Sequence, residues 1–123
     1  MTTHVVIIED NAQSARLAAR LLRKAGYDVK TAEDGEIGFN TVQEQAPDIV
    51  LIDLGLPDID GQTVIGLMRE LPSMATVPIV AFTAYPIDIA QQMAKTYGCA
   101  GVISKPIDTH RFAEQVGEFL KRD

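Results

Sequence analysis

The amino-acid sequence predicts an α/β protein, in which a parallel sheet of five strands carries five helices on its two faces. Two observations support this fold class. Several short runs are apolar throughout rather than at every second residue, which is typical of strands buried on both faces. Between these runs, apolar residues recur at the spacing of an amphipathic helix, and strands that alternate with helices form parallel sheets.

Five segments are predicted to be strands, and they are taken here in chain order. HVVIIE at 4–9 is a β-branched, apolar run, whereas YDVKTA at 27–32 is less apolar and is expected to be less buried. DIVLID at 48–53 and VPIVAFT at 77–83 resemble the first run, and AGVIS at 100–104 is a shorter example. β-Branched residues favour strands, which supports all five assignments.

Five helices are predicted between and after these strands. Four have apolar residues spaced to lie on one helical face. The segment 35–45 is the fifth, although two glycines interrupt it, and Asp108 is placed to cap the last helix. The four apolar stripes are Ala18, Leu21, Leu22 and Ala25; Val64, Leu67, Met68 and Leu71; Ala90, Met93, Ala94 and Tyr97; and Phe112, Val116, Phe119 and Leu120.

Length and composition indicate one soluble domain that spans residues 1–123. Apolar residues make up 46% and charged residues 23%, as in ordinary globular proteins. The net charge of −6 argues against nucleic acid as a ligand. The single cysteine, Cys99, allows neither an internal disulfide nor a cysteine-based zinc cluster. The N-terminal residues resemble neither a signal peptide nor a membrane span, so we expect a cytoplasmic domain.

Polar side chains follow the predicted strands at the edge where parallel α/β sheets bind ligands. The first strand ends in Glu9 and Asp10, the third ends at Asp53, the fourth ends at Thr83, and Lys105 follows the fifth. Three neighbouring carboxylates repel one another, which favours a bound proton or cation. Oxygen ligands alone suit Mg²⁺, and the lack of histidine and cysteine at this edge disfavours zinc.

The same side chains suit phosphoryl transfer. An ionised Asp53 is able to act as a nucleophile and form an acyl phosphate. Lys105 would neutralise the added charge, and the hydroxyl of Thr83 would hydrogen-bond a phosphoryl oxygen. Phosphoryl transfer depends mainly on positioning and charge stabilisation, so this small set of residues is sufficient.

Four motifs give the chain a resemblance to a known family. VVIIEDN at 5–11, DIVLIDLGLPDIDG at 48–61, IVAFTA at 79–84 and ISKP at 103–106 occur in this order along nearly the whole chain. Together they resemble the receiver domain of bacterial two-component response regulators. The resemblance implies a flavodoxin-like receiver fold with the strand order 2-1-3-4-5.

The resemblance also implies a metal site around the phosphoacceptor. By this resemblance Asp53 is the residue that is phosphorylated, and Glu9, Asp10 and Asp53 hold Mg²⁺ together with the backbone carbonyl of Gly55. Gly55 occupies one of two positions that tune loss of the phosphoryl group in this family. It has no side chain that could orient an attacking water.

The same resemblance implies roles for other residues in switching. Thr83 is the switch hydroxyl, Lys105 is the cation, and Pro106 follows a peptide bond that is usually cis in the family. At the position of the usual aromatic switch residue, this chain has Val102. Tyr85 occupies the second tuning position, and we hypothesise that it takes over part of the switching role or shields the acyl phosphate from water.

The function implied is that of a phosphoacceptor in a two-component phosphorelay. A sensor histidine kinase or a histidine phosphotransfer protein would pass a phosphoryl group to Asp53 in the presence of Mg²⁺. This would change the face formed by the fourth and fifth helices and the fifth strand, which binds a downstream target protein. We expect no enzymatic activity beyond the domain's own phosphorylation and dephosphorylation, no membrane contact, and a monomer or weak homodimer.

Several alternatives remain open from the sequence alone. A degenerate receiver would bind partners without phosphorylation, which Val102 allows but the intact set of site residues argues against. A phosphohydrolase would need a second aspartate where Gly55 stands, and a flavin-binding domain would need a phosphate-binding loop after the first strand. The first helix also carries basic residues that form either a solvated face or, as in this family, a docking surface for the phosphodonor: Arg16, Arg20, Arg23 and Lys24.

Overall fold

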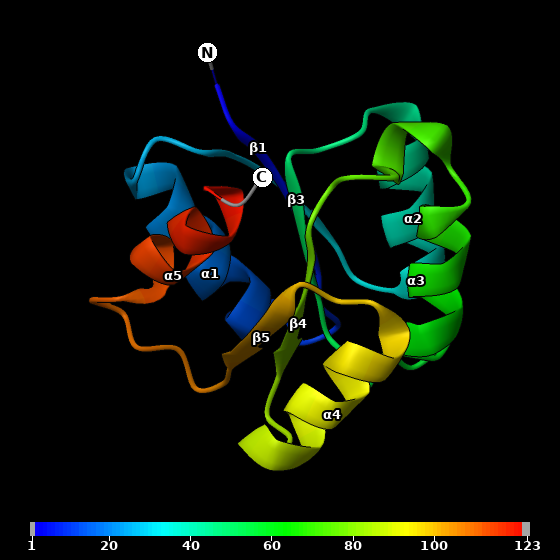
Figure 1. The fold of residues 1–123 in the computed structure, drawn as a ribbon. Coiled ribbons are helices and arrows are strands. Elements are labelled where there is room, and N and C mark those ends of the chain that lie inside the picture. The colour runs from blue at the N-terminus through cyan, green and yellow to red at the C-terminus, as the bar shows by residue number, and fades with distance from the viewer. Residues whose placement is uncertain (1, 122–123) are drawn as a thin grey trace.

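A parallel sheet of five strands lies at the centre of the computed structural model, which describes residues 2–121 (Figure 1). The strand order is β2-β1-β3-β4-β5, and all four neighbouring pairs are parallel. This confirms the predicted fold class and strand order. The strands are β1 His4–Ile8, β2 Asp28–Ala32, β3 Ile49–Ile52, β4 Ile79–Thr83 and β5 Gly101–Ser104.

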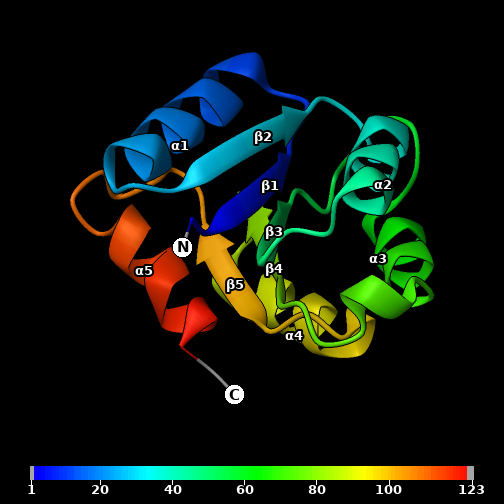
Figure 2. The same ribbon diagram turned by 90° about the horizontal axis from the view of Figure 1, so that it is seen from above.

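Helices cover both faces of the sheet, as predicted. One face carries α1 and α5, and the other carries α2, α3 and α4 (Figures 1 and 2). Within residues 2–121, none of these helices combines the length and hydrophobicity that crossing a membrane requires. The helices are α1 Ala12–Lys24, α2 Gly35–Glu44, α3 Gly61–Arg69, α4 Ile87–Tyr97 and α5 Phe112–Leu120, with a short 3₁₀ helix, η1 Pro72–Met74, after α3.

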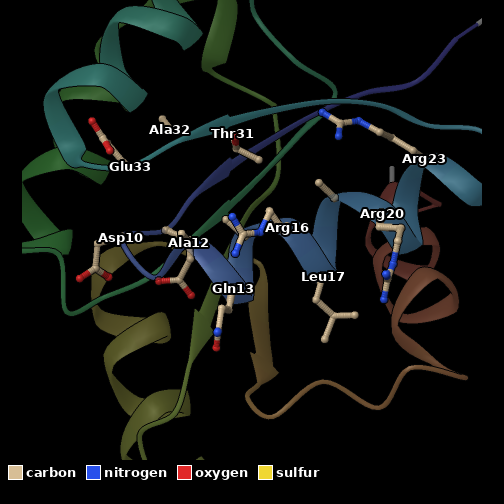
Figure 3. Close-up of a pocket in the computed structure, with 13 residues that line it drawn as sticks. Asp10, Ala12, Gln13, Arg16, Leu17, Arg20, Arg23, Thr31, Ala32 and Glu33 are labelled. Carbon is tan, nitrogen blue, oxygen red and sulfur yellow. The ribbon is translucent and has the colours of Figure 1, made fainter.

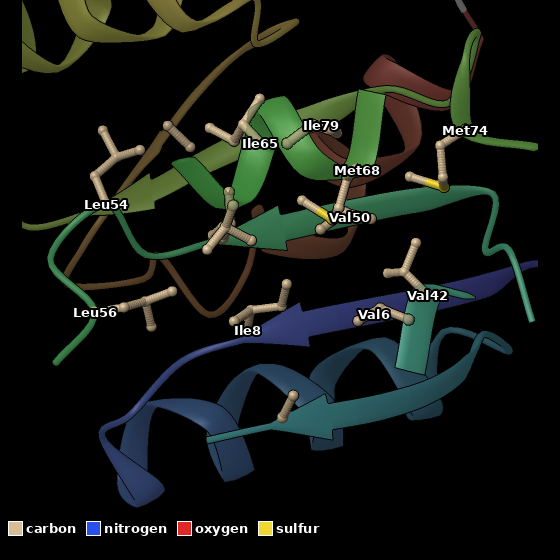
Figure 4. Packing of buried hydrophobic residues seen from close by; sticks show 14 of the residues in the cluster. Val6, Ile8, Val42, Val50, Leu54, Leu56, Ile65, Met68, Met74 and Ile79 are labelled. Atoms are coloured by element: carbon tan, nitrogen blue, oxygen red, sulfur yellow. The ribbon is translucent and has the colours of Figure 1, made fainter. Parts of the chain in front are cut away.

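Two hydrophobic layers explain why the strand segments are apolar throughout. Val6 and Ile8 of β1 point to the side of α2 and α3, where they pack with residues of β3 and β4 (Figure 4). Val5 and Ile7 of the same strand point to the other layer, which includes side chains of α1 and α5. Each buried side chain of this size stabilises the fold by about 1.5–3 kcal/mol relative to exposure.

The start of α5 differs from its prediction. The helix begins at Phe112, and its N-terminal cap, Arg111, makes no capping hydrogen bond through its side chain. The carboxylate of Asp108 instead accepts a hydrogen bond from the backbone N–H of His110, at 3.0 Å. The prediction that Asp108 caps α5 is therefore wrong, because its carboxylate is used by the turn that precedes the helix.

Candidate functional site

Three carboxylates meet beyond the ends of β1 and β3. Glu9 and Asp10 directly follow β1, and Asp53 directly follows β3, where its N–H donates to the carbonyl of Ile8 at 2.9 Å. Carboxylate oxygens of the three acids lie within 4.8 Å of one another. Such a cluster of oxygen ligands has the composition of a site for a hard divalent cation.

Lys105 reaches into this cluster from the end of β5. Its ammonium group forms an ion pair with the carboxylate of Glu9 and lies 3.2 Å from Oδ2 of Asp53. The same nitrogen is 5.1 Å from the centre of the Phe82 ring, which adds a favourable cation–π contact. The peptide bond between Lys105 and Pro106 is cis. The structure thus brings together a cation and two acids that lie far apart in the sequence.

The burial of Glu9 makes this cluster electrostatically unusual. Its side chain is inaccessible to solvent, and burial raises its pKa to about 7, against the lowering effect of the hydrogen bond from Lys105. Burial alone would lower the pKa of Lys105, but the hydrogen bond to Glu9 and the charge of Asp53 outweigh this, and its pKa is raised. Lys105 therefore stays protonated at neutral pH. A divalent cation would favour the ionised form of Glu9, so the residues present fit a metal.

Thr83 ends β4 and is buried, with 1% of its surface exposed. Its side-chain oxygen accepts a hydrogen bond from the backbone N–H of Tyr85, at 3.1 Å. The hydroxyl proton remains available to donate to another acceptor. Thr83 therefore offers a single polar group at the end of an otherwise apolar strand.

Gly55 and Tyr85 approach each other next to Asp53. The N–H of Gly55 donates to Oδ1 of Asp53 at 2.9 Å. A side chain at position 55 would begin 3.3 Å from the hydroxyl of Tyr85 and 3.6 Å from Oδ1 of Asp53. The absence of a side chain at Gly55 therefore leaves room for the tyrosine hydroxyl beside the loop that carries Asp53.

Val102 lies on β5 opposite Ala81 of β4 and packs, half-buried, against the hydrophobic layer on the side of α2 and α3. The position therefore carries a half-buried aliphatic side chain, where the resemblance noted from the sequence implies an aromatic ring. Tyr85, in contrast, is 41% exposed.

Two contributions to the site were missed by the sequence analysis. Phe82 lies beneath the ammonium group of Lys105, although it was read only as part of a strand. Asp58 lies in the loop after β3, and its carboxylate accepts hydrogen bonds from the N–H groups of Gly35 and Glu36, at 2.9 and 3.0 Å. It thereby ties the loop after β3 to the start of α2. No local pattern signals these contacts, because the partners are distant in sequence.

Comparison with known proteins agrees with this geometry. The model of the response regulator receiver domain matches residues 5–117. The chain belongs to this family. As a receiver, it is similar to the polar-differentiation response regulator DivK of Brucella ovis, with 30% identity over 120 residues that cover 98% of each chain.

Solved structures extend the comparison. A response regulator protein from Burkholderia multivorans is 33% identical, with a TM-score of 0.78 and coverage of 100% of this receiver and 98% of that chain. The chemotaxis response regulator CheY4 of Vibrio cholerae has a TM-score of 0.90 at 22% identity, over 97% of this receiver and 99% of that chain, and at this identity the likeness concerns the fold. The predicted family, a receiver domain of two-component signalling, is thus confirmed.

Proposed function

We propose that this receiver accepts a phosphoryl group on Asp53 from a partner phosphohistidine, in a reaction that requires Mg²⁺, and that the modification switches a protein-binding face. The observation that supports this proposal best is the position of Asp53. Carboxylate oxygens of Asp53, Glu9 and Asp10 lie within 4.8 Å of one another. Oδ2 of Asp53 also lies 3.2 Å from the ammonium nitrogen of Lys105. A nucleophile flanked by metal ligands and a fixed cation suits phosphoryl transfer.

In the proposed reaction, a carboxylate oxygen of Asp53 attacks the phosphorus atom of the phosphohistidine. A phosphorus–oxygen bond forms while the phosphorus–nitrogen bond breaks, and the leaving imidazole takes up a proton from solvent. Mg²⁺ held by Glu9, Asp10, Asp53 and the carbonyl of Gly55 would neutralise charge on the transferred oxygens. Lys105 would add a second positive charge, and its contact with Oδ2 of Asp53 supports that role.

The switch begins at Thr83 in this proposal. Its hydroxyl, which already accepts a hydrogen bond from Tyr85, donates its proton to a phosphoryl oxygen on Asp53. This movement shifts a pre-existing equilibrium between two shapes of the face formed by α4, β5 and α5. Exposed Ile87 and Ile89 lie at the start of α4, directly after Tyr85. A movement of the Thr83 side chain would therefore reach the exposed isoleucines of α4 through only a few residues of the chain.

We infer the partners from the same chemistry. The donor is a sensor histidine kinase or a histidine phosphotransfer protein, and the readout is a downstream target protein in the cytoplasm. The net charge of −6 disfavours nucleic acid as the target. The receiver acts as a monomer or a weak homodimer, and it catalyses only its own phosphorylation and dephosphorylation.

One observation favours a second candidate, a receiver that binds its partner without being phosphorylated. Val102 is an aliphatic core residue where the family has an aromatic switch. Beryllofluoride, which mimics the phosphoryl group on aspartate, separates the two candidates by NMR. With Mg²⁺, the phosphoacceptor proposal expects amide shifts at Thr83, Tyr85 and along α4. Shifts confined to the loop after β3 would support the phosphorylation-independent module, and an Asp53→Asn variant serves as the control that cannot bind the mimic.

A further inference from the structure

A groove of about 670 Å³ lies between α1 and β2, and it shares Glu9 and Asp10 with the cluster of acids (Figure 3). Small side chains of α1, those of Ala15 and Ala19, form part of its floor. A larger residue at any of these positions would fill the space. The volume is within the range of cavities that hold small organic ligands, roughly 300–1,000 Å³.

Three arginines line this groove along α1: Arg16, Arg20 and Arg23. Arg23 donates to the backbone carbonyl of Val29 at 2.8 Å, which holds its guanidinium group across the groove. Among residues 2–121, neither Arg16 nor Arg20 has a carboxylate within ion-pair distance. Two unpaired arginines beside a fixed one, on a chain of net charge −6, form a local site for an anion.

The two ends of the groove differ in charge. Glu33 and Asp10 lie at the end opposite to Arg23, with Arg16 between them (Figure 3). An occupant that is negative throughout would be repelled from the acidic end. The groove therefore suits a ligand with an anionic group at one end and hydrogen-bond donors at the other.

The free edge of β2 does not suit an extended peptide. Among the described residues β2 pairs only with β1, so its outer backbone groups are available for pairing in principle. The guanidinium group of Arg23 already donates a hydrogen bond to the carbonyl of Val29 on this outer edge. A strand added here would have to displace that hydrogen bond.

We propose that this groove binds a nucleotide whose base carries an amino group, such as an adenine nucleotide. The phosphates bind Arg16 and Arg20, the small side chains of the floor accommodate the ribose and base, and Glu33 accepts a hydrogen bond from the amino group. Arginine pairs with phosphate through parallel hydrogen bonds, and a carboxylate accepts from an amino-bearing base edge. Asp53, the proposed phosphoacceptor, does not line this groove.

The test is an NMR titration of the intact chain with ADP in buffer that contains EDTA, so that no metal bridges the phosphates. We expect saturable amide shifts along α1 and β2. The double variant Arg16→Ala with Arg20→Ala should weaken binding by roughly tenfold or more, since two charge-assisted hydrogen bonds are lost. Lys24→Ala is the matched control, because Lys24 lies on the same helix but does not line the groove, and its affinity for ADP should be unchanged.

Two further measurements separate recognition from general charge attraction. Ala12→Trp fills the groove at an exposed position without altering any charge, and it should abolish the ADP shifts while circular dichroism remains that of the folded protein. UDP lacks the amino group and should bind more weakly than ADP, and Glu33→Ala should remove that difference.

Several results would overturn the proposal. No saturable shift with ADP would exclude the groove as a nucleotide site. Equal weakening by Lys24→Ala would show that only the overall charge of α1 matters. Equal affinity for inorganic phosphate, ADP and UDP would contradict recognition of the base. Binding that appears only with Mg²⁺ would place the phosphates at the acidic cluster instead of the arginines.

Discussion

At the scale of single residues, Tyr85 lies close to Gly55 beside the carboxylate of Asp53. The tyrosine hydroxyl lies 3.3 Å from the point at which any side chain at position 55 would begin, and that point is 3.6 Å from Oδ1 of Asp53. The aromatic ring of Tyr85 thus lies beside Asp53, while Gly55 has no side chain that could orient a water molecule. Exclusion of water from an acyl phosphate slows its hydrolysis.

We therefore expect Tyr85→Ala to shorten the lifetime of the aspartyl phosphate by up to about tenfold, equivalent to about 1.4 kcal/mol in the barrier. Tyr85→Phe, which keeps the ring, should retain most of the lifetime. The decay of the phosphorylated protein, followed by intact mass after the phosphodonor is removed, measures this directly. Ile87→Ala, a change at a nearby exposed residue, is the control. An unchanged lifetime in Tyr85→Ala would refute the shielding role.

At the scale of secondary-structure elements, hydrogen bonds from distant residues fix the start of α2. The carboxylate of Asp58 accepts hydrogen bonds from two N–H groups in the first turn of this helix. These bonds lower the pKa of Asp58 below its ordinary value of 3.8, and the bond from Gly35 has the largest effect. A lowered pKa in the folded state means that the ionised form stabilises the fold. This contribution is present above the pKa of the unfolded chain and is lost as the pH falls through the lower folded value.

It follows that Asp58→Ala should lower the melting temperature at pH 7, and that the difference from wild type should shrink as the pH approaches 3. Thermal unfolding monitored by circular dichroism at pH 7, 5 and 3 gives the comparison. Glu44→Ala, at the other end of α2, should change stability little at any of these pH values. A difference for Asp58→Ala that is constant over the whole range would contradict the role of the ionised carboxylate.

One of the two glycines that interrupt the second predicted helix, Gly38, has a packing role. A Cβ atom on Gly38 would lie 2.5 Å from Cδ1 and 2.7 Å from Cγ1 of Ile8, so α2 contacts the sheet at this glycine. Gly38→Ala should therefore destabilise the fold by about 1–3 kcal/mol through overpacking, despite its better helix propensity. A Cβ atom on Gly66 of α3 would meet no atom of another element within 4 Å in the part of the chain that the structure describes.

Gly66→Ala is thus the matched control, and it should stabilise the protein by up to about 1 kcal/mol because alanine favours a helix. Urea unfolding of the two variants tests the pair. If Gly38→Ala were as stable as Gly66→Ala, the close approach of α2 to Ile8 would not constrain the fold.

At the scale of the whole molecule, the sequence predicts what depends on local pattern and chain order. Apolar runs identified four of the five strands, whereas β2 was predicted from a less apolar segment. Because parallel strands share one edge, Glu9, Asp10 and Asp53 were expected to meet there. The strand order came from the family resemblance. Contacts that depend on how distant side chains meet were not predictable, such as Asp58 with the start of α2 and Arg23 with the carbonyl of Val29.

Histidine contacts illustrate the same limit. His4 and Asp28 stand at the start of adjacent strands, where their side chains lie 2.8 Å apart, and nothing in the local sequence of either residue indicates a partner. The pair forms only because β1 and β2 align in this register. Register is a property of the folded sheet, and it determines which polar side chains become neighbours.

The most direct test of the proposed function is intact-mass spectrometry after incubation with acetyl phosphate and Mg²⁺, beside Asp53→Asn. We predict the gain of one phosphoryl group by the wild-type chain, and no gain in the variant or when Mg²⁺ is replaced by EDTA. A rapid quench at several times ensures that a short-lived adduct is detected. A wild-type chain that stays unmodified at every time, or a variant that gains the same mass, would contradict Asp53 as the phosphoacceptor.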